Sequence, residues 1–171
     1  MKQLYASLIA VFFLLPLSAA AGGVPWGEPN NTPGRFIVLS SYNNEAVFDS
    51  ETGLVWEQSP STSTFPWSST GLITAATYCN RLDVGNRFGW RLPTLQELAS
   101  LVDRSQSNLA LPAGHPFSNV QSNFYWSATT SAANASRAWV VFSGSGFAFT
   151  VVKSEAEFVW CVRGGQGVDP Q

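Results

Sequence analysis

Leu92-Pro93-Thr94-Leu95-Gln96-Glu97-Leu98 decides the fold, because it predicts where a helix begins and which side of it is buried. Thr94 and Glu97 have the spacing of a capping box, in which the threonine accepts from a helix amide and the glutamate reaches back to the threonine amide. Pro93 disfavours helical backbone in the residue before it. We predict a helix from Thr94 to about Val102. Its buried residues are expected to be Leu95, Leu98 and Leu101 or Val102.

A second helix is predicted upstream, from about Leu72 to Asp83. Apolar residues recur there at three- and four-residue steps, which places them on one face. Ser69 or Thr70 is suited to cap its start, and Gly85 is suited to follow its end. The face consists of Ile73, Ala76, Cys79, Tyr78 and Leu82. Cys79 is therefore expected to point inward.

Short strands are predicted on both sides of the helices, separated by turn-forming residues. Three precede them: Arg35–Leu39, Ala46–Asp49 and Leu54–Gln58. Four follow them: Phe124–Ala128, Ala138–Phe142, Gly146–Val152 and Phe158–Arg163. Ser59–Ser69 and Ser105–Asn123 show no period and are predicted to be loops. This order predicts an α+β fold with short antiparallel sheets, without the βαβ alternation of a parallel sheet.

The last predicted strand carries apolar side chains on both faces. Alternation places Phe158, Trp160 and Val162 on one face, and Val159, Cys161 and Arg163 on the other. Cys161 and Cys79 are the two cysteines of the chain. A disulfide is the interpretation expected in an oxidising compartment, with two buried free thiols as the alternative.

The chain starts with a stretch that has the features of a signal peptide, residues 1–21. Lys2 supplies a positive charge, Leu8–Leu17 an apolar run, and Ala19-Ala20-Ala21 a small-residue cleavage site. We expect a linker at 22–34, one domain at 35–165 and a tail at 166–171. A periplasmic or extracellular location and no membrane span after cleavage follow from this interpretation.

The charge pattern argues against binding to nucleic acid. After removal of the predicted leader, eight Lys and Arg remain against eleven acids, a net charge of −3. Phosphate binding needs clustered cations, and this chain has neither a basic stripe nor a charge run.

Five ordered motifs resemble the Lcl C-terminal domain family. They are Thr52–Trp56, Trp90–Leu98, Tyr125–Thr129, Ala138–Gly144 and Cys161–Gly164, within a match from about Asp49 to Gly165. The resemblance implies a C-type-lectin-like fold of the formylglycine-generating-enzyme type and a binding role toward glycans. It also implies that the helix cysteine and the strand cysteine are joined by the structural bridge of lectin-like folds. Gly89 and Trp160 depart from the family, which often has Asp and Arg there, so a polyanion ligand is less secure here.

The sequence offers little for catalysis. His115 is the single histidine, and no nucleophile elbow accompanies it. Metal-ligand spacings are missing, and Glu28-Pro29-Asn30 matches a lectin calcium triplet only outside the family match. A copper-dependent oxidase of the family fold uses paired cysteines, but reactive thiols need exposed, electropositive sites. We expect no enzyme activity, no metal and no cofactor.

Aromatic and polar side chains supply the candidate binding residues. Trp56, Trp90, Trp126 and Trp139 fall in family motifs and are expected in the core. Arg91 and Arg163 are expected to pair with acids or backbone oxygens. The predicted ligand residues are Trp67, Thr129, Thr130, Asn134, Arg137 and Trp160.

The predicted ligand surface combines the Ser105–Asn123 loop, the Thr129–Arg137 loop and the terminal hairpin, since loops on a rigid scaffold are where binding usually occurs. The expected partner is a glycan or a protein. The rival hypothesis is an assembly subunit of an envelope or surface-appendage complex, which an exposed stripe at Phe158 and Trp160 would favour.

Overall fold

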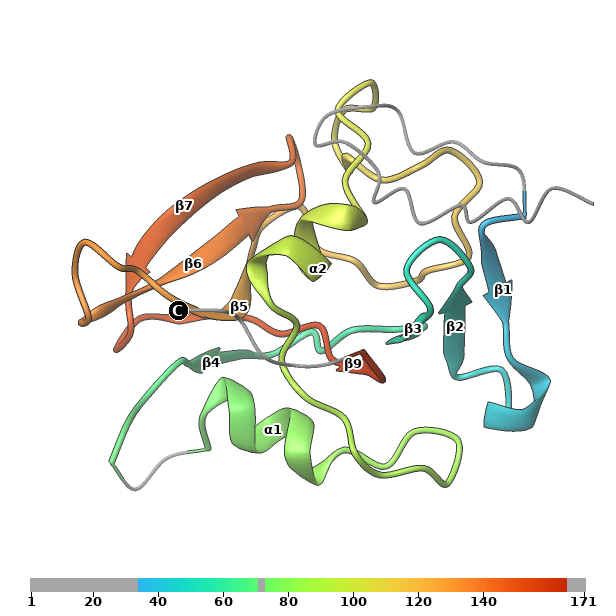
Figure 1. Cartoon of the computed structure of the whole chain (residues 1–171), viewed down its shortest axis with the longest axis horizontal. Helices are drawn as coiled ribbons and strands as arrows, with labels where there is room; N and C mark the ends of the chain where they lie inside the picture. Colours follow the sequence, from blue (N-terminus) through green and yellow to red (C-terminus); the bar gives the residue numbers. More distant parts are fainter. Residues whose placement is uncertain (1–33, 71–72, 166–171) are drawn as a thin grey trace, which may run out of the picture.

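A computed structural model describes residues 34–70 and 73–165 (Figure 1). The predicted leader 1–21, residues 22–33 of the predicted linker and the tail 166–171 lie outside the described residues. Within them the chain is α+β, with two short helices and nine strands in two mostly antiparallel sheets. The predicted fold class is therefore confirmed.

The first sheet has the order β1-β2-β3-β9 and is antiparallel throughout. Its strands are β1 Phe36–Val38, β2 Ala46–Asp49, β3 Leu54–Glu57 and β9 Val162–Arg163. A short 3-10 helix, Ser40–Tyr42, connects β1 to β2.

The second sheet has the order β4-β8-β5-β6-β7. Its strands are β4 Thr64–Pro66, β8 Ala156–Phe158, β5 Phe124–Thr130, β6 Arg137–Phe142 and β7 Phe147–Val152. β5 and β8 make a single parallel pair, and the other neighbours are antiparallel. β7 lies at the edge of this sheet.

The helices begin at capping boxes. Helix α2, Leu95–Ser100, starts at Thr94, whose hydroxyl accepts from the Glu97 amide while the Glu97 carboxylate accepts from the Thr94 amide. This capping box is confirmed. Helix α1, Ala75–Arg81, starts at Thr74 rather than at Ser69 or Thr70. The reason is a reciprocal pair of bonds between Thr74 and Thr77, which also satisfies two free amides.

Two strand predictions need correction. β4 lies inside the segment Ser59–Ser69 that we predicted to be a loop, because pairing with β8 rather than local composition determines its conformation. The predicted strand Phe158–Arg163 is instead split between β8 and β9. The split occurs because the chain leaves the second sheet there and joins the first. The segment Ser105–Asn123 has neither helix nor strand, as predicted.

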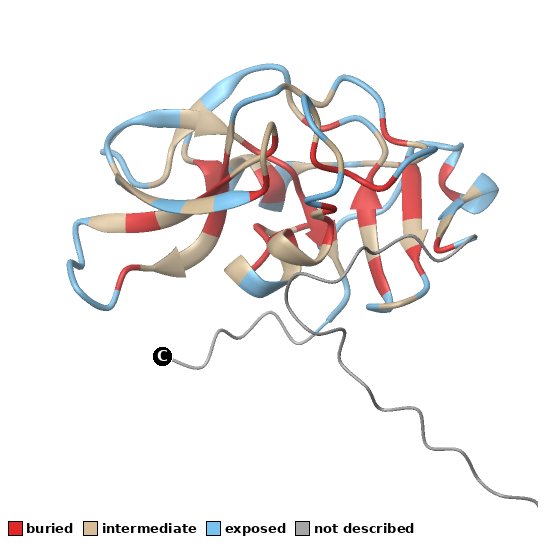
Figure 2. Ribbon diagram, turned by 90° about the horizontal axis from the view of Figure 1, so that it is seen from above, coloured by how far each residue is buried: buried red, intermediate tan, exposed pale blue. Residues whose placement is uncertain are grey.

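Buried residues occur in the strands of both sheets (Figure 2). They form two core clusters, which lie on opposite faces of β5 and β6. The first core contains α1 residues and the side chains of Trp126 and Val140, whereas the second contains α2 residues and the side chains of Tyr125 and Val141. The domain therefore has helices on both sides of its larger sheet, with alternate strand residues facing each core.

The segment Val159–Val162, called here the crossing segment, contributes to both cores. Val159 and Cys161 belong to the first core, and Trp160 and Val162 to the second. This alternation confirms the faces predicted for these residues. All four side chains are at most 2 % exposed.

Trp160, which we predicted to be a ligand residue at the surface, is instead buried. Its ring packs edge-on against Phe117 with centroids 4.8 Å apart, and against Trp56 at 5.9 Å. Its indole N–H donates to the Glu57 carbonyl at 2.9 Å. Trp160 is buried because both faces of the crossing segment are covered. The exposed Phe158–Trp160 stripe therefore does not exist.

The other tryptophans of the family motifs are mostly buried, as expected. Trp56, Trp90 and Trp126 are at most 1 % exposed, whereas Trp139 is only half-buried. Trp139 lies on β6 opposite Thr150 of the edge strand β7.

Cys79 and Cys161 form a disulfide, which confirms the pairing. Both residues are completely buried. The bond joins α1 to the crossing segment, so it links an early helix to the last strands of the chain.

Loss of this disulfide is expected to lower the free energy of unfolding by about 4–5 kcal/mol, because it closes a loop of 82 residues. Urea denaturation of the Cys79→Ala/Cys161→Ala variant, followed by circular dichroism, measures the change. A denaturation midpoint equal to that of the unaltered protein would contradict the role assigned to the disulfide.

Truncation of Trp160 to alanine is expected to cost about 3–5 kcal/mol, because it leaves a cavity between three aromatic rings and removes the N–H bound by the Glu57 carbonyl. Phe88→Ala is the matched control, since Phe88 is 65 % exposed and the change is expected to cost less than about 0.5 kcal/mol. Comparable losses in the two variants would refute the buried position of Trp160.

Candidate functional site

A polar cluster forms around Lys153, directly after β7. Its ammonium group donates to the Thr130 hydroxyl at 2.9 Å and lies 3.9 Å from the centre of the Trp67 ring. Its backbone N–H donates to the Ser136 carbonyl at 2.9 Å, and its carbonyl accepts from the Ser68 amide at 3.1 Å. These residues are called here the Lys153 cluster: Trp67, Ser68, Thr130, Ser136 and Lys153. Three segments distant in sequence thus meet at one position.

The neighbouring loop between β5 and β6, residues 131–136, is held by its own hydrogen bonds. The Ser131 amide donates to the Arg137 carbonyl, and the Arg137 amide donates to the Asn134 carbonyl, both at 2.9 Å. The Asn134 side chain accepts from both the amide and the hydroxyl of Ser136. Residues 132–136 are nevertheless exposed. The loop therefore presents polar groups to solvent in a defined conformation.

Trp67, Thr130 and Asn134 are the predicted ligand residues that the structure brings together. Trp67 is half-buried, and its indole N–H donates to the Ser127 carbonyl at 2.8 Å. The Lys153 ammonium lies over one face of its ring, and the indole also packs against the first core. A sugar can therefore stack on this face of Trp67 only if Lys153 moves.

Thr129 and Arg137 make contacts that stabilise the fold. The Thr129 hydroxyl accepts from the Leu95 amide at 2.9 Å, so it satisfies an N–H in the first turn of α2. The Arg137 guanidinium donates to the hydroxyl and the carbonyl of Thr150 on β7. Trp160, in the second core, is not part of this cluster.

The long loop Ser105–Asn123 lies at the other end of the sheet, so the combined loop surface that we predicted is not formed. Its Ala110 amide donates to the Ser143 carbonyl beyond the end of β6, whereas residues 131–136 precede the start of β6. Six strand residues separate the two ends by about 17–20 Å. The loop instead covers the second core, because Phe117 packs between Phe36 and Trp160.

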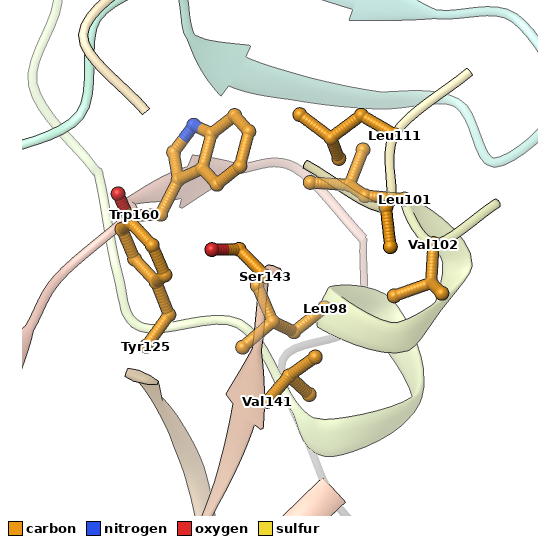
Figure 3. A pocket seen from close by; sticks show the side chains of 9 residues that line it. Leu98, Leu101, Val102, Leu111, Tyr125, Val141, Ser143 and Trp160 are labelled. Carbon is orange, nitrogen blue, oxygen red and sulfur yellow. The ribbon is translucent and has the colours of Figure 1, made fainter. Parts of the chain in front are cut away.

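The apolar pocket in the second core is too small to bind a ligand (Figure 3). Side chains from α2, β5, β6 and the crossing segment surround a space of about 10 Å³. This is about the size of one water molecule, and the lining is almost wholly apolar. It is lined by Leu98, Leu101, Val102, Ala110, Leu111, Tyr125, Val141, Ser143 and Trp160. The pocket is a packing defect of the core.

The Lcl C-terminal domain model matches residues 45–163, more than half of the 171 residues. The chain belongs to the Lcl C-terminal domain family. No curated protein matches it. The matched range includes both cysteines of the disulfide and the whole Lys153 cluster.

The family motif Trp90–Leu98 has a structural role in this Lcl domain. Arg91 forms a two-point ion pair with Glu97 at 2.7 and 2.8 Å and also donates to the Gly164 carbonyl. Arg163 donates to the Phe88 carbonyl and to the Tyr42 hydroxyl. Both arginines therefore make the contacts to acids or oxygens that we predicted.

The single histidine of this Lcl domain packs against an aromatic side chain. The rings of His115 and Phe117 are tilted by 30° with their centres 5.8 Å apart, and burial lowers the pKa of His115 below the usual value. No group of three or more His, Cys, Asp or Glu able to hold a metal ion occurs in residues 34–70 and 73–165. Nor is any helix in these ranges long and apolar enough to cross a membrane.

Glu57 is a buried acid that sequence reasoning missed. Its side chain accepts from the Cys161 amide at 2.6 Å, and its carbonyl accepts from the Trp160 indole. Burial raises its pKa to about 8, against a smaller opposite effect of the Cys161 hydrogen bond. No cation forms a salt bridge with it among the described residues. The side chain is therefore protonated at neutral pH and stabilises the crossing segment in its neutral form.

The Lys153 cluster was only partly predictable. Lys153 and Ser136 carry no motif. The pairing of β6 with β7 brings them together, and the hydrogen bond from the Ser68 amide to the Lys153 carbonyl brings Trp67 beside them. The part of the sequence that indicated a polar binding surface was the stretch 129–136, which is rich in Ser and Asn. Trp67 was found because it is a tryptophan outside the family motifs.

The stability that Glu57 contributes is expected to fall as pH rises from about 4.5 to about 8. In this window the unfolded chain has lost the Glu57 proton and the folded chain has kept it, so unfolding releases a proton. The slope contributed is at most about 1.4 kcal/mol per pH unit. Urea denaturation at a series of pH values measures it.

The variant Glu57→Gln keeps an acceptor for the Cys161 amide but has no carboxyl group that can titrate. Its stability is expected to change less with pH and to exceed that of the unaltered protein above pH 8. Asp83→Asn is the control for loss of an exposed acid. Parallel pH curves for all three proteins would disprove the assignment.

Proposed function

We propose that this protein is an exported, non-catalytic binding module that recognises a glycan through the Lys153 cluster and the adjacent loop 131–136. The observation that carries the proposal is that Lys153 forms hydrogen bonds with Ser68, Thr130 and Ser136, and so brings these residues together. A site that is already ordered loses less entropy when a ligand binds.

The chemistry of the cluster suits sugar hydroxyls. A lysine ammonium has three donors, and one of them is used on Thr130. Threonine and serine hydroxyls and the Asn134 amide both donate and accept, as a sugar hydroxyl does. The partly exposed Trp67 side chain adds apolar contact beside these polar groups. A neutral glycan fits this arrangement better than a polyanion, since Lys153 is the cluster's one cation.

A C-type-lectin-like fold is part of the proposal. Two features support it, the two helices with short antiparallel strands and the disulfide between the first helix and the last strands. Export to the periplasm or the cell exterior is supported by the apolar leader Leu8–Leu17 and by the disulfide, which persists in oxidising compartments.

A non-catalytic role is supported by how the reactive side chains are used. Both cysteines of the sequence are in one buried disulfide, which leaves no thiolate for redox catalysis. His115, the single histidine, packs against an aromatic ring, and no hydroxyl or thiol of residues 34–70 and 73–165 is hydrogen-bonded to its side chain.

The alternative class, an assembly subunit, loses its original support because Trp160 is buried. A different observation supports a contact with another protein chain: Phe147 and Phe149 of β7 are about half exposed. Such exposed apolar residues mark protein contacts when they cluster.

A glycan array probed with the purified protein tests the proposal, followed by titration calorimetry on the sugars that bind. Asn134→Ala and Lys153→Ala are each expected to weaken binding at least about tenfold, the effect of losing one or two hydrogen bonds. Binding to no glycan on the array would count against the proposed function.

Asn80→Ala and Arg87→Ala are the controls, because they remove an asparagine and a cationic side chain from exposed positions outside the Lys153 cluster. They are expected to bind as the unaltered protein does. Equal weakening by the control pair would show that the sugar binds elsewhere or through charge alone.

A further inference from the structure

Strand β7 forms an uncovered edge of the larger sheet. It pairs with β6 on one side, and no described element pairs with it on the other (Figure 1). Its residues Phe147, Phe149 and Val152 are 54 %, 48 % and 38 % exposed. The strand has no charged residue and no proline, the features that usually keep an edge from pairing with another chain.

The backbone of β7 has two residues ready for further pairing. The Lys153 amide donates to the Ser136 carbonyl across the β6–β7 ladder. Along β7 the backbone N–H and C=O groups of successive residues point alternately toward β6 and away from it. Since those of Lys153 point toward β6, those of Ala148 and Thr150 point away from it. The Thr150 carbonyl already accepts from Arg137 but has a second lone pair. The edge is therefore able to add a strand.

We propose that β7 is the contact strand of a two-fold symmetric dimer, in which it pairs antiparallel with β7 of a second copy and Phe149 lies opposite Phe149. In this register Ala148 exchanges hydrogen bonds with Thr150 of the second copy, and Phe147 lies opposite its Val151. Non-bonded pairs of an antiparallel ladder bring side chains closest, which suits the aromatic pair at the centre.

Charge complementarity singles out a second copy as the occupant. Arg104 contacts the Gly146 carbonyl at 3.4 Å and lies over the Phe147 ring, at the start of β7. The Glu155 amide donates to the Val152 carbonyl at 2.9 Å, at the end of β7. The proposed register places Gly146 opposite Val152 of the second copy. Arg104 of each copy therefore faces Glu155 of the other, which gives two symmetric ion pairs.

These two charges have no ionic partner within the described part of one chain. The salt bridges found there involve Arg35 and Arg91, not Arg104 or Glu155. Both side chains are exposed. They are free to pair between copies, and each pair forms twice because the contact has two-fold symmetry.

The proposed contact is small, because each copy contributes one six-residue strand and its flanking side chains. Contacts of this size lie at the low end for specific interfaces and give concentration-dependent association. The dimer is expected to form in the micromolar range and above.

Sedimentation-velocity centrifugation of the purified protein from about 1 to 300 µM tests the proposal. The unaltered protein is expected to shift from monomer to dimer. R104E and E155R each place like charges in contact and are expected to raise the dissociation constant at least about tenfold. The double variant R104E/E155R restores opposite charges and is expected to restore the dimer. A monomer at every concentration would overturn the proposal.

Two further measurements locate the contact. Hydrogen exchange at high concentration is expected to slow at the amides of Ala148 and Thr150 and not along β1, the edge of the other sheet. F149D is expected to abolish the dimer, whereas F88D, at a more exposed phenylalanine outside β7, is expected to leave it intact. A dimer that survives F149D, or a double charge variant that fails to associate, would also refute this contact. These outcomes do not depend on glycan binding.

Discussion

The fold depends on the crossing segment Val159–Val162, because its alternate side chains complete two separate cores. Val159 and Cys161 close one, and Trp160 and Val162 close the other. The disulfide fixes the segment to α1, and Glu57 accepts its Cys161 amide from inside the protein. A buried backbone N–H that cannot reach water needs a hydrogen-bond acceptor inside the protein. Burial of the crossing segment therefore requires the Glu57 side chain, which burial keeps in its neutral form.

The Glu97 carboxylate connects the crossing segment to the other helix. It caps the Thr94 amide, pairs with Arg91 and thereby positions the guanidinium on the Gly164 carbonyl just after β9. The family motif around Thr94 is thus explained without a ligand. Its residues fix the segment just after β9 against the start of α2.

Local signals predicted much of this fold, and tertiary contacts account for the rest. The capping box at Thr94 and the alternation of the crossing segment depend on neighbouring residues and were read from sequence. Burial of Trp160 was missed, because alternation says which residues share a face and not whether both faces are covered. β4 and the Lys153 cluster depend on pairings between distant strands, which composition does not reveal.

The two proposed surfaces share β7, and this has a consequence for binding. Lys153 lies four residues after Phe149. A two-fold axis at Phe149 therefore separates the two Lys153 residues by eight strand positions, about 27 Å along the joined sheet. A glycan polymer that spans this distance contacts two weak sites at once, and the second contact is then intramolecular. Modest affinity at each cluster is sufficient for stable attachment under that arrangement.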